Sequence, residues 1–204
     1  MNHIKKLYDW VLSWAASPYA LTALFVLAFT ESIFFPIPPD ILLIAMAMGA
    51  VAKSFRFALI CTIGSVSGAI VGYYIGNLAW LNSNGEFTGL ANLFFNNIPG
   101  FTHELYNNIK ILFDEWDFWI IFTAGFTPIP YKVFTITSGA FEMNTLMFII
   151  ASVISRGARF FLVAYLIWKF GPSIKNFIDK YFNWVALGFT ACLIGGFVLI
   201  KYMI

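Results

Sequence analysis

Long hydrophobic runs alternate with short polar intervals along the chain. Three runs, at residues 57–80, 145–170 and about 182–200, reach the roughly 20 residues that an α-helix needs to cross a bilayer. Shorter apolar arms, at residues 19–35, 41–52, 118–126 and 133–141, are too short to cross it alone. The pattern predicts three spanning helices and two pairs of short helices.

Two prolines separated by one isoleucine interrupt each pair of short arms. The first break covers residues 34–40 and ends at Asp40, and the second covers residues 126–132 and ends at Lys132. Proline lacks the amide hydrogen and clashes with the preceding turn, so each cluster ends a helix. Because freed backbone groups within hydrocarbon need protein or water around them, we expect two re-entrant hairpins with wet tips. A broken spanning helix is the alternative. The prolines predicted at the hairpin tips are Pro36, Pro38, Pro39, Pro128 and Pro130.

The two breaks belong to a longer repeat. Residues 4–15 and 105–116 place apolar side chains at helical spacing, which is typical of helices lying at a membrane surface. The order of amphipathic helix, broken hairpin and spanning helix therefore occurs twice, with an offset of 92 residues between the breaks. We interpret the chain as one membrane domain, with repeat 1 at about 1–80, repeat 2 at about 103–170 and a C-terminal helix at about 182–200. Residues 81–104, rich in Asn and Gly, predict a loop.

The distribution of Lys and Arg predicts how the repeats are oriented. Loops that stay in the cytoplasm are enriched in these residues. With the N-terminus in the cytoplasm and both hairpins re-entrant, seven basic residues are cytoplasmic and two, Lys110 and Lys201, lie outside. The seven are Lys5, Lys6, Lys53, Arg56, Lys169, Lys175 and Lys180. This orientation makes the halves an inverted repeat, an arrangement that in many transporters places the site at the repeat interface.

Glycine recurs at every fourth residue of the run at residues 57–80. Residues at this spacing share one helix face, and small residues there let membrane helices approach closely. We interpret the face as a packing surface rather than a ligand site. Its members are Gly64, Gly68, Gly72 and Gly76.

Composition supports an all-α integral membrane protein. Hydrophobic residues make up 60% of the 204 residues and charged residues 11%, whereas a soluble domain has about 25% charged residues. The cysteines, Cys61 and Cys192, lie in apolar segments and are expected to pack as small side chains. No nucleophilic triad, metal-ligand spacing, phosphate loop or basic stripe is evident. We therefore predict a protein that is not an enzyme, without cofactor, metal or nucleic-acid partner.

Five charged residues fall at membrane depth, where each costs about 2.5–3.5 kcal/mol at a span centre unless a partner or water offsets it. We expect them to converge, because Arg156 and Arg159 share a helix face that can meet both hairpin tips. In a structural interpretation, Glu31 and Asp40 only pair with the arginines. In a functional one, the carboxylates carry protons and the arginines bind phosphate. Lys132 either anchors phosphate or extends to the interface.

These residues resemble the DedA family, also called the SNARE-associated or VTT-domain family, over residues 19–170. The motif residues are Glu31, Ser32 and residues 35–40 in the first half, and Phe126, Thr127, Pro128, Ser138, Gly139, Ala140 and Met143 in the second. The family commonly carries arginines on both sides of the second proline motif. This chain has Gly125 and Tyr131 there, so we expect Lys132 and the pair Arg156 and Arg159 to replace that charge.

The resemblance implies a transporter that moves lipids such as undecaprenyl phosphate across the bacterial inner membrane with the proton motive force, and eukaryotic relatives that scramble phospholipids. It implies essential acidic roles for Glu31 and Asp40. The leading hypothesis is translocation of a phosphate-headed lipid, with its head group on Arg156, Arg159 and Lys132. The alternatives are a proton-coupled antiporter of ions or small cationic molecules and a structural or assembly membrane protein. Membrane lipids and protons are the expected partners, and the oligomeric state is open.

Overall fold

The fold is described from a computed structural model, which defines residues 10, 14, 17–82, 84–97, 102–127 and 130–171. Its elements over these residues are α2 (Ala20–Glu31), α3 (Asp40–Gly49), the 3₁₀-helix η2 (Val51–Lys53), α4 (Ser54–Trp80), α5 (Gly89–Asn97), α6 (His103–Phe126), α7 (Tyr131–Ala140) and α8 (Thr145–Phe170). Most of the amphipathic helix predicted at residues 4–15, the tip residue Pro128 and the C-terminal helix predicted at residues 182–200 lie outside the described residues.

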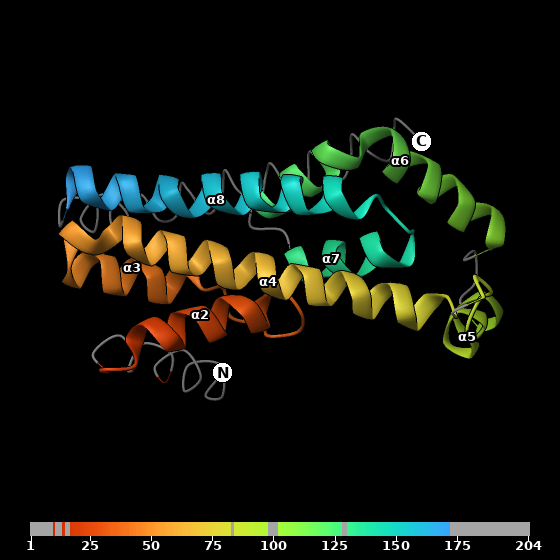
Figure 1. The fold of residues 1–204 in the computed structure, drawn as a ribbon, viewed down its shortest axis with the longest axis horizontal. Coiled ribbons are helices and arrows are strands. Elements are labelled where there is room, and N and C mark those ends of the chain that lie inside the picture. Colours follow the sequence, from red (N-terminus) through yellow and green to blue (C-terminus); the bar gives the residue numbers. More distant parts are fainter. Residues whose placement is uncertain are drawn as a thin grey trace.

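The prediction of an all-α membrane protein is confirmed. Within the described ranges, the contact between Leu81 and Phe87 is an isolated bridge and no strand forms. In the part of the chain that the structure describes, two segments, Val51–Trp80 and Thr145–Phe170, are long and apolar enough to cross a membrane. The first contains α4 and the second is α8, and these two long helices run antiparallel, side by side (Figure 1).

Two helical hairpins enter this pair from opposite ends (Figure 1). The first, α2 and α3, has both outer ends near the start of α4 and its turn near the middle of the molecule. The second, formed by the C-terminal half of α6 and by α7, approaches from the other end and also turns near the middle. Each turn coincides with one of the proline breaks, so the two breaks meet at mid-height of the bundle.

Proline chemistry explains where the first hairpin turns. The carbonyl of Thr30 accepts the amide hydrogens of Ile33, Phe34 and Phe35 and so closes the end of α2. The prolines that follow have no amide hydrogen and cannot continue the helix. Pro39 then occupies the N-cap position of α3, which begins at Asp40. In the second hairpin, Pro130 likewise occupies the N-cap of α7.

Two apolar cores lie on either side of a polar layer. One core contains Leu24, Leu43, Cys61 and Phe160, from α2, α3, the first half of α4 and the second half of α8. The other contains Tyr73, Ile121, Phe141 and Phe148, from the remaining halves of α4 and α8 and from the second hairpin with its exit turn. Buried polar residues separate the two cores, namely Ser32, Ser65, Ser152, Ser155, Thr135 and Arg156. The hairpin tips therefore meet in a polar layer.

The glycine face of α4 contacts both hairpins. A Cβ built at Gly64 would lie 2.6 Å from the carbonyl oxygen of Phe25, and one at Gly68 would meet the carbonyl of Phe29, both on α2. A Cβ at Gly72 would lie 2.7 Å from the Thr135 hydroxyl, and one at Gly76 would meet the carbonyl of Ile136, both on α7. The backbones of α2 and α7 thus approach α4 at successive glycines.

The prediction of a loop at residues 81–104 is wrong in part, because residues Gly89–Asn97 form α5. Thr88 caps this helix by accepting the amide hydrogen of Ala91, and its own hydroxyl donates to the carbonyl of Ala79. Phe95 packs edge-on against Phe87, with 5.0 Å between ring centroids. Capping and aromatic packing therefore outweigh the poor helix propensity of Asn and Gly.

The amphipathic segment predicted at residues 105–116 and the apolar arm predicted at residues 118–126 are two helical segments that follow each other across a kink and are together labelled α6. Trp116 has non-helical dihedral angles, φ −116° and ψ 18°, so the helix kinks where its surface half meets its hairpin half.

Candidate functional site

A cavity of about 190 Å³ lies between the two hairpin tips. This volume is well above the ~10–15 Å³ that a cavity needs to hold one water molecule. Three cations and two carboxylates line the cavity together with prolines from both tips. The lining residues are Glu31, Pro36, Pro38, Asp40, Pro130, Lys132, Arg156 and Arg159. All five charged residues that the sequence places at membrane depth are therefore brought to one site.

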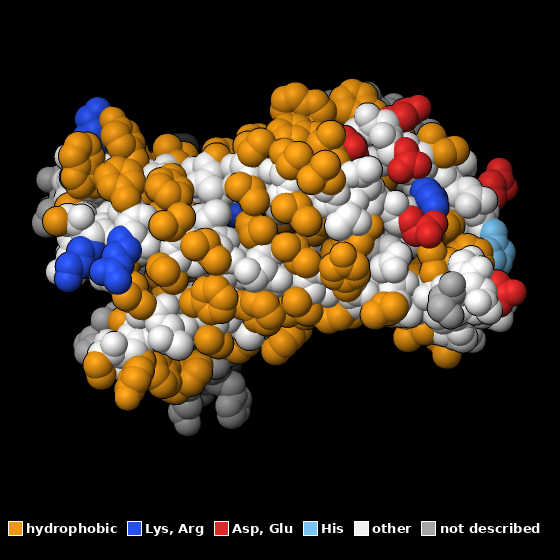
Figure 2. All heavy atoms as spheres, viewed as in Figure 1, with side chains coloured by type: hydrophobic (Ala, Val, Ile, Leu, Met, Phe, Trp, Pro, Cys, Tyr) orange, Lys and Arg blue, Asp and Glu red, His pale blue; other side chains and the backbone are white. Residues whose placement is uncertain are grey.

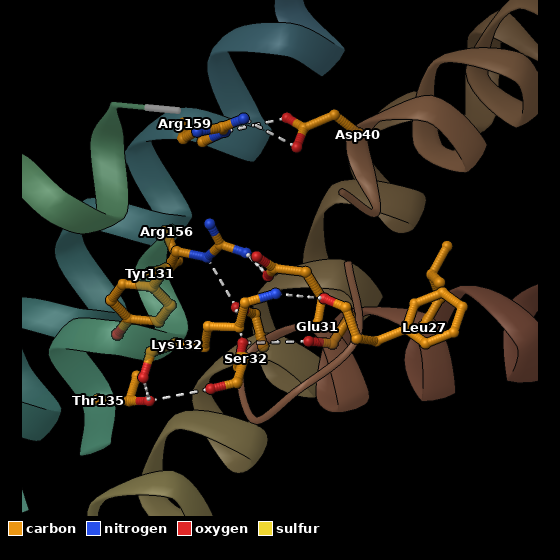
Figure 3. Close-up of polar contacts among 12 residues, drawn as sticks. Leu27, Glu31, Ser32, Asp40, Tyr131, Lys132, Thr135, Arg156 and Arg159 are labelled. Atoms are coloured by element: carbon orange, nitrogen blue, oxygen red, sulfur yellow. Dashed lines mark hydrogen bonds and ion pairs between the residues drawn. The ribbon is translucent and has the colours of Figure 1, made fainter. Parts of the chain in front are cut away.

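Arg156 is the most enclosed of these charges, with a side chain that is 3% exposed. Its Nη2 donates to Glu31 Oε2 at 2.7 Å, and its Nε donates to Ser65 Oγ at 2.7 Å (Figure 3). The guanidinium carbon lies 4.8 Å from the ring centroid of Tyr131 and 4.7 Å from that of Phe160. Hydrogen bonds at its edge and aromatic rings beside it hold this guanidinium in place.

Arg159, one helical turn further along α8, pairs with Asp40 at the start of α3. Its Nε donates to Asp40 Oδ1 at 3.0 Å and its Nη2 to Oδ2 at 2.9 Å, which is the bidentate geometry that gives an arginine–carboxylate pair its specificity (Figure 3). The remaining arm, Nη1, donates to the carbonyl of Thr127 at 2.7 Å. Arg159 thus connects the first hairpin to the end of α6.

Lys132 connects the two tips directly. Its Nζ donates to the carbonyl of Phe35 at 3.0 Å, so its ammonium lies in the cavity rather than at the membrane interface (Figure 3). A second contact supports the first, because the hydroxyl of Thr135 donates to the carbonyl of Ser32 at 2.9 Å. Backbone carbonyls freed by the first break therefore receive donors from the second hairpin, which satisfies groups that would otherwise lie unpaired in hydrocarbon.

Several residues of the site were missed by reasoning from the sequence. Ser65 lies beside Gly64 on α4 and bridges Arg156 to Ser32, whose Oγ is 2.8 Å from Ser65 Oγ. Tyr131 supports the guanidinium and donates its hydroxyl hydrogen to Ser152 at 2.6 Å. The sequence feature that could have identified Ser65 and Ser152 is a hydroxyl side chain within an otherwise apolar span. Such a side chain needs a hydrogen-bond partner inside a membrane.

Packing explains the two positions at which the chain departs from the second DedA motif. A Cβ at Gly125 would meet the side chain of Ser155, so α6 and α8 leave no room for an arginine there. At the other position, the ring of Tyr131 lies against the guanidinium of Arg156. In this chain, positive charge reaches the second hairpin from α8 and from Lys132.

An apolar groove of about 580 Å³ lies on the other side of the first hairpin turn. Thr30 and Phe35 line the groove, and their chain neighbours Glu31 and Pro36 line the charged cavity. The remaining lining residues are Trp10, Trp14, Tyr19, Thr22, Ala23, Val26, Leu27, Phe34 and Leu42. One turn of the chain thus separates a charged cavity from an apolar groove.

Comparison with known proteins identifies the family. The family model of the VTT domain matches residues 35–169. An uncharacterized protein from Haemophilus influenzae is 37% identical over 179 residues, which cover 85% of this chain and 87% of that protein. An uncharacterized protein from Methanocaldococcus jannaschii is 30% identical over 141 residues, covering 69% and 79%. No solved structure matches the chain. The domain match contains the second half of the first hairpin, the whole second hairpin and nearly all of α8, and so includes Asp40, Lys132, Arg156 and Arg159 of the site, and the chain belongs to the VTT-domain family, also known as the DedA or SNARE-associated family.

Proposed function

We propose that the protein translocates a phosphate-headed lipid across the bacterial inner membrane, with protons carried by Glu31 and Asp40. The observation that carries this proposal is the charged cavity between two hairpin tips that enter from opposite ends of the bundle. Transport sites at the midplane of inverted repeats have this arrangement. The head group would bind to Arg156, Arg159 and Lys132, since guanidinium and ammonium groups are the usual phosphate ligands in proteins.

The charge of the cavity favours an anionic substrate over the antiporter of small cations. Three cations face two carboxylates, so the cavity has a net charge of +1 when all five groups are ionised. Each carboxylate is already paired with an arginine. A cation would have to displace an arginine from a carboxylate inside a positively charged cavity, whereas an anion is attracted to it.

The neighbouring apolar groove favours a lipid over a soluble anion. A lipid has a charged head and a hydrocarbon chain, and the cavity and the groove lie on the two sides of one hairpin turn. Burial of hydrocarbon in such a groove contributes about 0.8 kcal/mol for each CH₂ group removed from water. An amphiphile can therefore place its charged head in the cavity and its hydrocarbon chain in the groove.

Reconstitution of the full chain in liposomes tests this function. We expect accelerated transbilayer movement of a labelled polyprenyl phosphate or phospholipid, and no acceleration for the matching polyprenyl alcohol, which lacks the phosphate. Glu31→Gln should lower the rate about tenfold or more, whereas Lys53→Gln, which removes an exposed charge far from the cavity, should leave it unchanged. Equal rates for phosphate and alcohol would reject a phosphate site. Exchange of a soluble cation driven by a pH gradient would instead support the antiporter.

We also propose that the N-terminus and the start of α4 face the cytoplasm. Figure 2 shows Lys and Arg gathered at one end of the molecule and Asp and Glu at the other. Exposed Lys53, Arg56 and Lys169 belong to the first end, where α4 starts and α8 finishes. Basic residues are retained on the cytoplasmic side during insertion.

Cysteine labelling in spheroplasts checks this orientation. In a background without Cys61 and Cys192, an impermeant thiol reagent should label Asn84→Cys in intact spheroplasts, and Lys53→Cys only after the membrane is opened. Both positions are exposed, so access to the reagent depends on the side of the membrane. Labelling of both positions from the same side would reject the proposed topology.

A further inference from the structure

The two arginines of the cavity are already engaged. Arg159 directs its Nε and Nη2 to Asp40 and its Nη1 to the carbonyl of Thr127. Arg156 directs its Nε to Ser65 and its Nη2 to Glu31, and aromatic rings lie near its guanidinium. Each guanidinium charge is already balanced by a carboxylate, so an arriving phosphate would have to compete with that carboxylate for the arginine. While both pairs are intact, the arginines are poor first ligands for an anion.

Lys132 differs from both arginines. Its ammonium has three donors, and the hydrogen bond that it makes within the described part of the chain is to a neutral carbonyl, that of Phe35. Among the same residues, the ion pairs are Arg156–Glu31, Arg159–Asp40 and Lys110–Glu142, and Lys132 belongs to none of them. A neutral carbonyl holds an ammonium less strongly than a carboxylate does. Lys132 therefore supplies the uncompensated positive charge of the cavity.

We propose that a phosphate group docks first on Lys132, and that Arg156 and Arg159 become its ligands only after protons neutralise Glu31 and Asp40. The inference rests on the proposed function and adds the order in which the cations of the site act. It applies to the phosphate of a lipid head group and to free phosphate alike, because both present the same anionic oxygens.

The charges of the cavity connect protonation to anion binding. With both carboxylates ionised the net charge of the five groups is +1, and each proton taken up raises it by one. The charged and titratable groups that act on Glu31 come from every element around it: Asp40 of α3, Cys61 of α4, Tyr131 and Lys132 of α7, and Arg156 and Arg159 of α8. Protonation of a carboxylate releases the N–H groups of its arginine, so one event both adds positive charge and frees a phosphate ligand.

Docking on Lys132 also affects the contact between the hairpins. The ammonium that would receive the phosphate is the one that holds the carbonyl of Phe35, across the gap between the two tips (Figure 3). A phosphate oxygen attracts the ammonium more strongly than a neutral carbonyl does, because both partners are then charged. Bound phosphate therefore competes with the carbonyl of Phe35 for Lys132, whereas the hydrogen bond from Thr135 to Ser32 does not involve the ammonium.

Binding measurements on the purified full chain at neutral pH test this order. The probes are dodecyl phosphate, which carries a lipid-like chain, and inorganic phosphate, which does not. Lys132→Gln should weaken binding about tenfold or more, the effect of losing one charge-assisted hydrogen bond. Lys132→Arg should retain binding, and Lys53→Gln should bind within about twofold of the wild type because its position is remote from the cavity.

Glu31→Gln gives the opposite sign and separates this inference from a purely structural role. Glutamine imitates the protonated carboxyl, frees Arg156 and adds one net positive charge, so binding should tighten about tenfold even though the transport rate falls. Thermal unfolding of each variant shows that it is folded. Wild-type affinity in Lys132→Gln, or weaker binding in folded Glu31→Gln, overturns the inference and leaves the proposed function standing. Binding of neither probe by the wild type overturns both, and binding of inorganic phosphate alone supports a soluble anion as the source.

Discussion

Replacing Gly139 with alanine is expected to lower the free energy of unfolding by about 3 kcal/mol, at the upper end of the usual cost of overpacking. A Cβ at Gly139 would meet the carbonyl of Tyr73 and lie 2.8 Å from the amide nitrogen of Asn77, and both atoms belong to the backbone of α4. A flexible side chain can rotate out of such a contact, whereas a helix backbone cannot. The helix α7 must therefore move away from α4 to accept a methyl group.

Displacement of α7 would also reach the site, because α7 carries Tyr131, Lys132 and Thr135. The matched control is Gly157→Ala on α8, where the new Cβ would lie 3.8 Å from the methyl group of Thr62, an ordinary contact. That control should be neutral or stabilising, since alanine is a better helix former by about 1 kcal/mol. Unfolding by SDS in mixed micelles measures both variants. Equal stability of the two would show that α7 does not pack against α4 through Gly139.

The placement of the elements was largely predictable from the sequence, because helix length and proline are strong local signals. A run of about 20 apolar residues is long enough to span a bilayer, and Pro36, Pro38 and Pro39 end α2 within a few residues of where it does end. The helix α5 was missed because its stability comes from the cap at Thr88 and from contacts with distant aromatic rings. Amino-acid composition alone does not reveal such contacts.

Which charged residues form the site was easier to predict from the sequence than which carboxylate pairs with which arginine. Charged side chains in an apolar span need partners, which brings Glu31, Asp40, Arg156 and Arg159 together on physical grounds. Which carboxylate faces which arginine depends on the height of each hairpin tip against α8, and a sequence does not fix that height to within one turn. The role of Ser65 depends on the same register, since its hydroxyl must lie level with Arg156 Nε.

The largest effect on the site itself is expected for Arg156→Gln, which should lower the free energy of unfolding by about 3–5 kcal/mol, the usual cost of breaking a buried ion pair by removing one partner. Glu31, 12% exposed, would remain as a carboxylate without its cation, and Asp40 adds like-charge repulsion. Ser65 would lose its donor, and the contacts of the guanidinium with Tyr131 and Phe160 would be lost.

The double variant Glu31→Gln with Arg156→Gln distinguishes stability from transport. It removes both charges, so it should recover most of the stability lost by Arg156→Gln. Lys110→Gln is the control, since the pair of Lys110 with Glu142 is exposed and should contribute less than about 1 kcal/mol. A double variant that is stable but does not translocate lipid means that the pair serves transport. Full transport by that variant would assign Glu31 and Arg156 to the fold alone, as the hypothesis of a structural or assembly protein requires.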